Sequence, residues 1–182
     1  QQLLTIVSLA YVSAVAVVDL RSRRIPNGLT LVAAAAGLVL NGLVGGFMGL
    51  ASAGLGLTIA LCALLPMYAG SGLGAGDVKA MAAVGALVGT PAVFVTIGFT
   101  LIGGAVAAIA VLIAAGELVP AVQRLHANLL LAKAGGSLGS IQPAAGETAG
   151  HRFPYGLAIA GGAAAGLWWM GRLQSLFAGA LQ

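Results

Sequence analysis

Six long apolar runs, separated by short segments rich in Gly, Pro and charged residues, set the pattern of this chain. The runs are continuous and do not alternate at a period of two residues, as the strands of a membrane barrel would. Backbone polar groups in lipid must be satisfied within the protein, so continuous apolar runs favour helices. We therefore predict an all-α fold with six transmembrane helices, over residues about 3–18, 29–45, 50–69, 78–90, 92–115 and 154–170.

Composition places the chain among membrane proteins. Of its 182 residues, 60% are hydrophobic and 7% are charged, whereas soluble domains carry roughly 25% charged residues. At about 20 residues per membrane crossing, the length allows five or six helices and two modest connections, without room for an additional soluble domain. We interpret residues 1–182 as a single membrane domain.

The longest polar connection spans about 117–152 and divides into two parts. In the first part, apolar residues recur at helical spacing opposite polar ones, which predicts an amphipathic helix on the membrane surface. The apolar residues are Leu118, Val122, Leu125 and Leu129. The second part, 135–150, is rich in Gly, Ala and Ser, and we expect it to be mobile.

The positions of the basic residues predict the orientation in the membrane. The net charge is +4, but the eight basic residues lie between and beside the apolar runs, where they are typical topology signals and do not indicate a nucleic-acid surface. With the N-terminus outside, seven of the eight face the cytoplasm and only Arg172 lies outside. We expect both termini outside, and the lipid bilayer, not nucleic acid, as the surrounding partner.

Cysteine and histidine offer no candidate chemistry. Cys62 is the only cysteine and lies inside an apolar run, which excludes a disulfide framework and a cysteine metal site. His126 and His151 are too isolated for a metal site. We expect no metal and no cofactor.

Two of the four acidic residues, Asp19 and Asp77, lie at the edges of apolar runs and beside positive charge. An Asp at the centre of a membrane helix costs about 2.5–3.5 kcal/mol even on the gentler scales, so its presence indicates function. The predicted orientation puts both acids at the cytoplasmic face. The adjoining runs, about 16 and 13 residues, give helices of roughly 24 and 20 Å, shorter than a core of about 30 Å. We expect both acids in a recess that water reaches.

Two carboxyl groups held around one water can hydrolyse an amide. They share a proton, because two like charges this close do not both ionise easily. The ionised member then takes a proton from the water while the protonated member polarises the scissile carbonyl. The residues alone leave two alternatives open, a proton or cation relay and a structural role as capping residues near positive anchors.

Residues around the second aspartate and before the last run are further candidates for substrate binding or site tuning. Gly74 and Gly76 either form a flexible turn or let a substrate backbone approach the carboxylate. Lys79 either tunes that carboxylate or has the commoner role of a cytoplasmic anchor. Arg152 and Tyr155 either line the substrate entrance or anchor the chain at the membrane interface.

Three motifs together resemble the type IV prepilin leader peptidases, membrane aspartic proteases with a GxGD motif. The first is Asp-Leu-Arg at 19–21 followed by Ile-Pro-Asn at 25–27, and the second is Gly-Ala-Gly-Asp-Val-Lys at 74–79. The third, Arg-Phe-Pro-Tyr-Gly-Leu-Ala at 152–158, is similar to the segment that opens the last helix in the short Flp/Tad-pilus members. The motifs occur in order, at helix ends, and cover nearly the whole span of the chain.

The resemblance implies both a catalytic pair and a substrate. Asp19 and Asp77 would be the catalytic dyad, and the substrate would be a prepilin whose short basic leader is removed on the cytoplasmic side of the bacterial inner membrane. The larger bifunctional members carry an N-terminal insertion with paired cysteines and also methylate the new amino terminus. This chain has 18 residues before Asp19 and no cysteine pair, so we expect a peptidase without N-methyltransferase activity.

Two other hypotheses stand beside this one. Presenilin and signal peptide peptidase also use a GxGD motif, but they carry a tyrosine before the first aspartate and a Pro-Ala-Leu motif, whereas Val18 precedes Asp19 here and that triplet does not occur. The alternative from a different class is a non-hydrolytic membrane protein. It would either use the paired acids as a proton or cation relay or be a component of pilus assembly.

Overall fold

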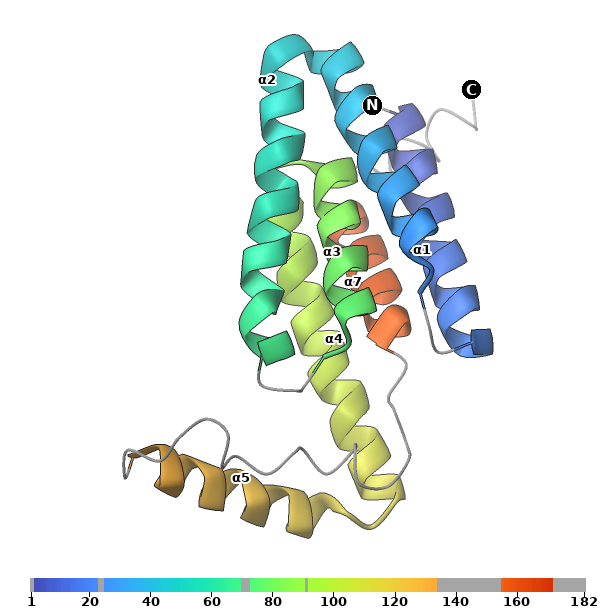
Figure 1. Cartoon of the computed structure of the whole chain (residues 1–182). Coiled ribbons are helices and arrows are strands. Elements are labelled where there is room, and N and C mark those ends of the chain that lie inside the picture. The colour runs from blue at the N-terminus through green and yellow to red at the C-terminus, as the bar shows by residue number, and fades with distance from the viewer. Residues whose placement is uncertain (1, 23–24, 70–72, 91, 134–154, 172–182) are drawn as a thin grey trace.

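The computed structural model describes residues 2–22, 25–69, 73–90, 92–133 and 155–171, and every regular element within these ranges is an α-helix. The predicted Gly-rich mobile stretch at 135–150 lies outside the described residues. The all-α prediction is confirmed for the described residues. The helices are α1 (Gln2–Ser22), α2 (Asn27–Ala69), α3 (Ala75–Val88), α4 (Ala92–Ala114), α5 (Leu118–Lys133) and α7 (Tyr155–Trp169) (Figure 1).

Helix α2 is a hairpin of two helical arms, which correspond to the predicted runs 29–45 and 50–69. The chain reverses at one end of the bundle (Figure 1), where Gly46 has φ 57° and ψ −144°. Glycine adopts this left-handed region readily because it has no Cβ. The turn is so tight that the two predicted helices follow one another without an intervening loop.

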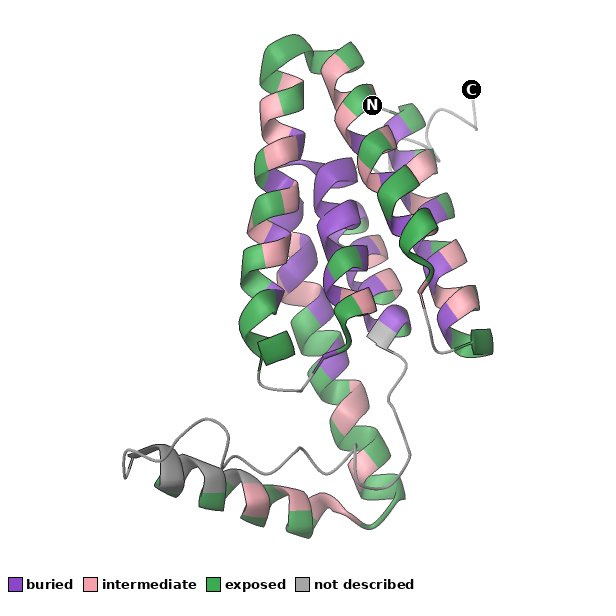
Figure 2. Ribbon diagram, viewed as in Figure 1, coloured by how far each residue is buried: buried purple, intermediate pink, exposed green. Residues whose placement is uncertain are grey.

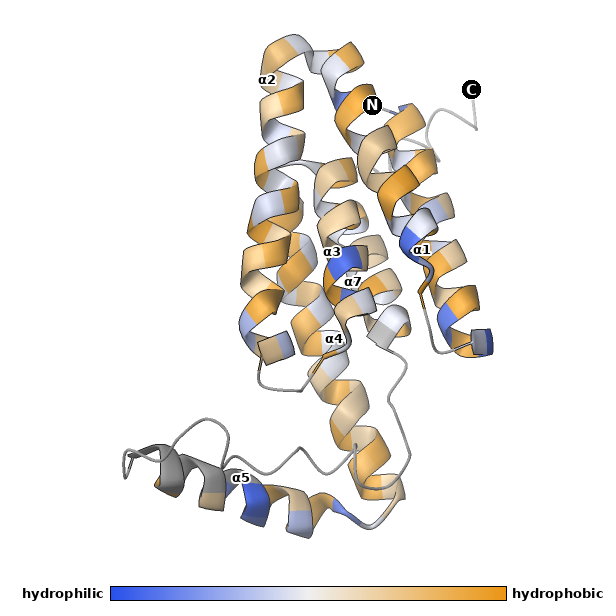
Figure 3. Cartoon of the chain, in the orientation of Figure 1, coloured by the Kyte–Doolittle hydropathy of each residue, from blue (hydrophilic) through white to orange (hydrophobic). Residues whose placement is uncertain are grey.

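Helices α1, α2 and α4 are long and apolar enough to cross a membrane. Their outward faces are largely apolar (Figure 3), and Phe47, at the turn of α2, is 78% exposed. Soluble monomers rarely expose such large contiguous apolar surface. The structure therefore supports a membrane protein, and the orientation with the N-terminus outside stays a prediction.

Helix α1 is longer than its apolar run predicts. It continues through Asp19 to Ser22, so its 21 residues measure about 32 Å, whereas the sequence predicts a helix of roughly 24 Å ending at the aspartate. The expected shortness of the first helix is therefore wrong. Helix α3 is short as predicted, with 14 residues and a length of about 21 Å.

Helix α3 lies between the two arms of α2 and is the most enclosed element of the bundle (Figures 1 and 2). All of its residues from 80 to 88 are buried. In the first arm, a Cβ added to Gly37 would lie 2.7 Å from the backbone of Ala86 and Leu87. In the second arm, a Cβ added to Gly56 would overlap the carbonyl oxygen of Gly85. These contacts between backbones require glycine.

Side chains from both arms also bind the far end of α3. The Asn41 amide donates to the carbonyl oxygens of Ala86 and Leu87, at 3.0 and 3.2 Å. Ser52 Oγ lies 3.1 Å from the Thr90 carbonyl oxygen and accepts from the Thr90 N–H at 2.9 Å. The last carbonyls of a helix have no partner within that helix, and unsatisfied backbone groups are costly in lipid. The two arms therefore fix where α3 ends.

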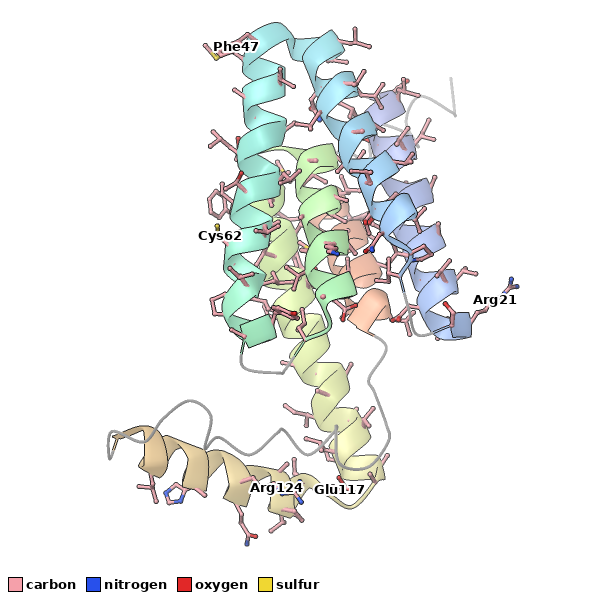
Figure 4. All side chains as sticks on the ribbon, in the orientation of Figure 1. Arg21, Phe47, Cys62, Glu117 and Arg124 are labelled. Atoms are coloured by element: carbon pink, nitrogen blue, oxygen red, sulfur yellow. The ribbon has the colours of Figure 1, made fainter. Side chains whose placement is uncertain are left out.

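The remaining helices bring several helix ends to one end of the bundle. α7 packs on α4 through Gly162 and Gly166, where an added Cβ would meet Thr100 and Thr96, and α1 packs on α7. The C-terminal end of α1 and the N-terminal ends of α2, α3 and α7 lie at this same end (Figure 1). Arg21 marks it, and Phe47 lies at the opposite end (Figure 4).

Helix α5 occupies the position of the predicted amphipathic helix. It follows α4 and lies across the end of that helix, away from the bundle (Figure 1). Glu117 and Arg124 lie where α4 passes into α5 (Figure 4). The predicted helix is confirmed, and its location on a membrane surface stays a prediction.

We predict that Gly85→Ala lowers the free energy of unfolding by about 1–3 kcal/mol, the usual cost of overpacking a close contact. The added methyl group would meet the backbone of Gly56. The measurement is thermal unfolding in detergent. Gly54→Ala is the matched control, because a Cβ at position 54 of α2 meets nothing within 4 Å. Equal stability of the two variants would contradict the proposed contact between backbones.

Candidate active site

Asp19 is buried near the end of α1 and is held by a different helix. Its side chain is only 6% exposed, and its Oδ2 accepts a hydrogen bond of 2.8 Å from the backbone N–H of Gly156. Gly156 lies in the first turn of α7, where N–H groups have no helical partner and the helix dipole is positive. The carboxylate therefore caps a helix that lies 137 residues away in sequence.

Gly156 makes this contact possible because it has no side chain. A Cβ added at this position would lie 2.7 Å from both Cβ and Oδ2 of Asp19. The sequence motif at 152–158 contains Gly156, but the residues singled out there were Arg152 and Tyr155. The sequence feature that could have pointed to Gly156 is its place at the start of an apolar run, next to Tyr155.

Asp77 lies in the first turn of α3 and is partly exposed. Its Oδ2 accepts a hydrogen bond of 3.1 Å from the backbone N–H of Gly74, the N-cap residue of α3. This is the half of a capping box in which the N3 carboxylate returns to the N-cap backbone. Gly76 lies beside the linker before α2, where an added Cβ would be 3.5 Å from Ile25.

Lys79 projects from α3 to the start of α2. Its Nζ donates a hydrogen bond of 3.1 Å to Oδ1 of Asn27, 52 residues earlier in the chain. The bond joins the second turn of α3 to the first residue of α2. The anchoring and tuning roles of Lys79 stay predictions.

Asp19, near the C-terminal end of α1, and Asp77, in the first turn of α3, lie at the same end of the bundle (Figure 1). A hydrogen bond joins the same two helices, since the Tyr11 hydroxyl donates to the carbonyl oxygen of Ala80 at 3.4 Å. The structure thus brings the end of α1, with Asp19, to the same end of the bundle as the segment 74–79, with Gly74, Asp77 and Lys79. Two carboxyl groups at one end of a bundle are the groups that general acid–base hydrolysis of a peptide bond needs.

Two predicted residues lie partly or wholly beyond what the structure describes. Arg152 falls outside the described residues, and Tyr155 is the first residue of α7, without a described side chain. Within the described residues, no cluster of three His, Cys, Asp or Glu side chains could hold a metal ion.

The fold and site define a helical membrane protein with two acids from separate helices at one end of its bundle. The model of the type IV leader peptidase family matches residues 6–115, more than half of the 182 residues. The chain belongs to this family, which confirms the resemblance and makes it a peptidase of the prepilin-processing kind. Searches of curated proteins and of solved structures return no match. The matched range contains both Asp19 and Asp77 and ends before α7.

We predict that Gly156→Ala reduces substrate cleavage by about 10²-fold, the scale expected when a reacting group shifts by about 1 Å. The new methyl group would displace Asp19 or α7, because it would lie 2.7 Å from the carboxylate. The measurement is kcat/KM on a reconstituted prepilin, together with thermal unfolding. Gly98→Ala, in α4, is the control, since its added Cβ meets nothing within 4 Å. A fully active Gly156→Ala enzyme would show that the contact is not needed.

We predict that Lys79→Met and Asn27→Ala each lower kcat/KM several-fold, and that the double variant loses no more than either single one. Residues that share one contact give non-additive effects of this kind. The measurement is a double-mutant cycle on prepilin cleavage across pH. If Lys79 instead tunes the carboxylate directly, Lys79→Met alone will displace the pH profile while Asn27→Ala leaves it unchanged.

Proposed function

We propose that this protein is an aspartic endopeptidase that removes the short basic leader from type IV prepilins of the Flp/Tad type. The reaction takes place at the cytoplasmic face of the bacterial inner membrane, in a multi-pass protein. The observation that carries the proposal is that the end of α1, which holds Asp19, and the first turn of α3, which holds Asp77, lie at one end of the bundle. The family match, which covers both residues, supports it.

The proposed chemistry is direct attack of water on the peptide bond. One carboxylate takes a proton from the water as its oxygen bonds to the carbonyl carbon, and the other carboxyl group donates a hydrogen bond to the carbonyl oxygen. Collapse of the tetrahedral intermediate breaks the C–N bond, and the leaving nitrogen receives a proton from the dyad. No covalent enzyme intermediate and no cofactor are required.

The hydrogen bonds of the two acids suggest a substitution that distinguishes the proposed catalysis from a purely structural role. Each bond uses Oδ2 as an acceptor for a backbone N–H at a helix N-terminus. Asparagine also accepts such a bond through its side-chain oxygen and is a good capping residue. It cannot, however, exchange protons with a water or a leaving group. Asp→Asn variants therefore retain the caps and lose the proposed catalysis.

We predict that Asp19→Asn and Asp77→Asn each reduce prepilin cleavage by at least about 10²-fold, in the range that general acid–base groups contribute. Thermal unfolding should stay close to that of the wild type. The measurement is cleavage of a co-reconstituted prepilin, read by mass spectrometry. The mass of the wild-type product should correspond to an unmethylated amino terminus, also when S-adenosylmethionine is supplied.

Glu117→Gln is the matched control, because Glu117 is an acid beyond the end of α4 and outside the dyad. It should cleave at nearly the wild-type rate. Near wild-type cleavage by either aspartate variant would contradict the dyad and favour a non-hydrolytic role for the acids. A methylated product would contradict the proposal of a peptidase alone.

A further inference from the structure

The helices of the bundle pack as two groups. α3 packs mainly between the arms of α2, whereas α7 packs mainly on α4 and α1. We call α2 with α3 the first unit, and α1 with α4 and α7 the second unit. Asp77 lies in the first unit and Asp19 lies in the second. The place of one acid relative to the other therefore depends on how the two units meet.

Each acid is held firmly within its own unit. In the first unit, the backbone of Gly85 meets that of Gly56, which fixes α3 against α2. In the second unit, Asp19 accepts the hydrogen bond from Gly156 of α7. Between the units, α1 contacts α3 at far fewer residues than α2 does. Because this contact is the smaller one, single side chains within it have a large influence on how α1 and α3 align.

Tyr11 reaches from one unit to the other. Its side chain is only 5% exposed, and its hydroxyl donates to the carbonyl oxygen of Ala80 at 3.4 Å. Ala80 lies less than one turn after Asp77, and Tyr11 lies about two turns, roughly 12 Å, before Asp19. The bond thus joins the two helices that carry the acids, at a point close to Asp77.

The hydroxyl of Tyr11 favours one alignment of these helices. Val12, Val15 and Val84 belong to the same buried apolar cluster as Tyr11, and a hydroxyl without a partner in such surroundings is costly. Apolar contacts have no preferred direction, so they alone would let α1 slide along α3. A slide by the rise of one residue, about 1.5 Å, would take the 3.4 Å bond beyond hydrogen-bonding distance.

A second polar contact between the units is less suited to this task. Thr100 Oγ1 of α4 lies 4.0 Å from Sδ of Met81 in α3. A thioether sulfur is a weak acceptor, and α4 carries neither acid. The bond from Tyr11 is therefore the contact that acts directly on the two helices of the pair.

We propose that Tyr11 is a positioning residue for the catalytic pair: its hydroxyl sets the register of α1 against α3, and thereby the place of Asp19 relative to Asp77. This inference rests on the proposed peptidase function. Tyr11 acts through the helices that carry the acids and not on the substrate. A small displacement of a reacting group slows the chemical step, while the groups that bind substrate stay in place. The expected signature is a lower kcat at an unchanged KM.

The first test is Tyr11→Phe, which removes the hydroxyl and keeps the buried ring. We expect kcat for prepilin to fall about tenfold, less than the roughly 10²-fold that a full 1 Å displacement costs. KM should stay within about twofold of the wild type. The pH profile of kcat should also change, since the titration of two neighbouring carboxyl groups depends on their separation. Tyr68→Phe, in α2, is the matched control, because Tyr68 is 46% exposed.

The control variant should have the kcat, KM and pH profile of the wild type. A kcat of Tyr11→Phe within about twofold of the wild type would overturn the inference while the peptidase function stands. A lower kcat with an unchanged pH profile would also overturn it, because a merely structural contact changes the amount of folded enzyme and not the titration of the pair.

The second test does not depend on cleavage. Spin labels are attached at Val17→Cys in α1 and Leu55→Cys in α2, both exposed positions, in a Cys62→Ser background that removes the exposed native cysteine. Tyr11→Phe should shift or broaden the distance distribution between the labels by about 1–2 Å, the scale of one residue rise, and Tyr68→Phe should not. Such a change supports the register role even if the wild type fails to cleave prepilin. An unchanged distribution, or an equal change in both variants, would overturn the inference.

Discussion

The fit of α3 between the two arms of α2 is the constraint on which the rest of the structure depends. Gly37 on one arm of α2 meets the backbone of Ala86 and Leu87 in α3, and Gly56 on the other arm meets Gly85 in α3. Lipid provides no hydrophobic force between membrane helices, so close packing and interior hydrogen bonds hold them together. Because α3 is fixed along its length, its first turn has a defined place beside α1. The position of Asp77 thus follows from close contacts at residues 85–87 of α3, between about two and three turns away from it.

The two aspartates are held in physically different ways. Asp77 accepts its hydrogen bond from Gly74, within its own helix start, so its carboxylate is positioned by local geometry. Asp19 accepts from Gly156, on a helix at the other end of the chain, so its position depends on how α1 packs against α7. To release the Asp77 carboxylate from its hydrogen bond, only the first turn of α3 has to open. To release the Asp19 carboxylate, α1 and α7 have to separate.

The sequence predicts the helices well because continuous apolar runs in a membrane protein have few alternatives. It also predicts the two acids, since ionisable residues are rare in this chain. The extension of α1 through Asp19 was missed because a charged residue after an apolar run resembles a helix end. Only tertiary packing supplies the Gly156 donor that lets the carboxylate remain inside a helix. The bond between Lys79 and Asn27 was missed for the same reason. A local sequence pattern does not show which distant segments are in contact.

The dependence of Asp19 on α7 has a consequence for how the protein matures. The chain is synthesised from its N-terminus, so α1 enters the membrane long before α7 exists. A buried acid without its partner is costly, and Asp19 gains the Gly156 donor only once α7 has docked. Both catalytic candidates are thus present in a nascent chain before the surroundings of Asp19 are complete.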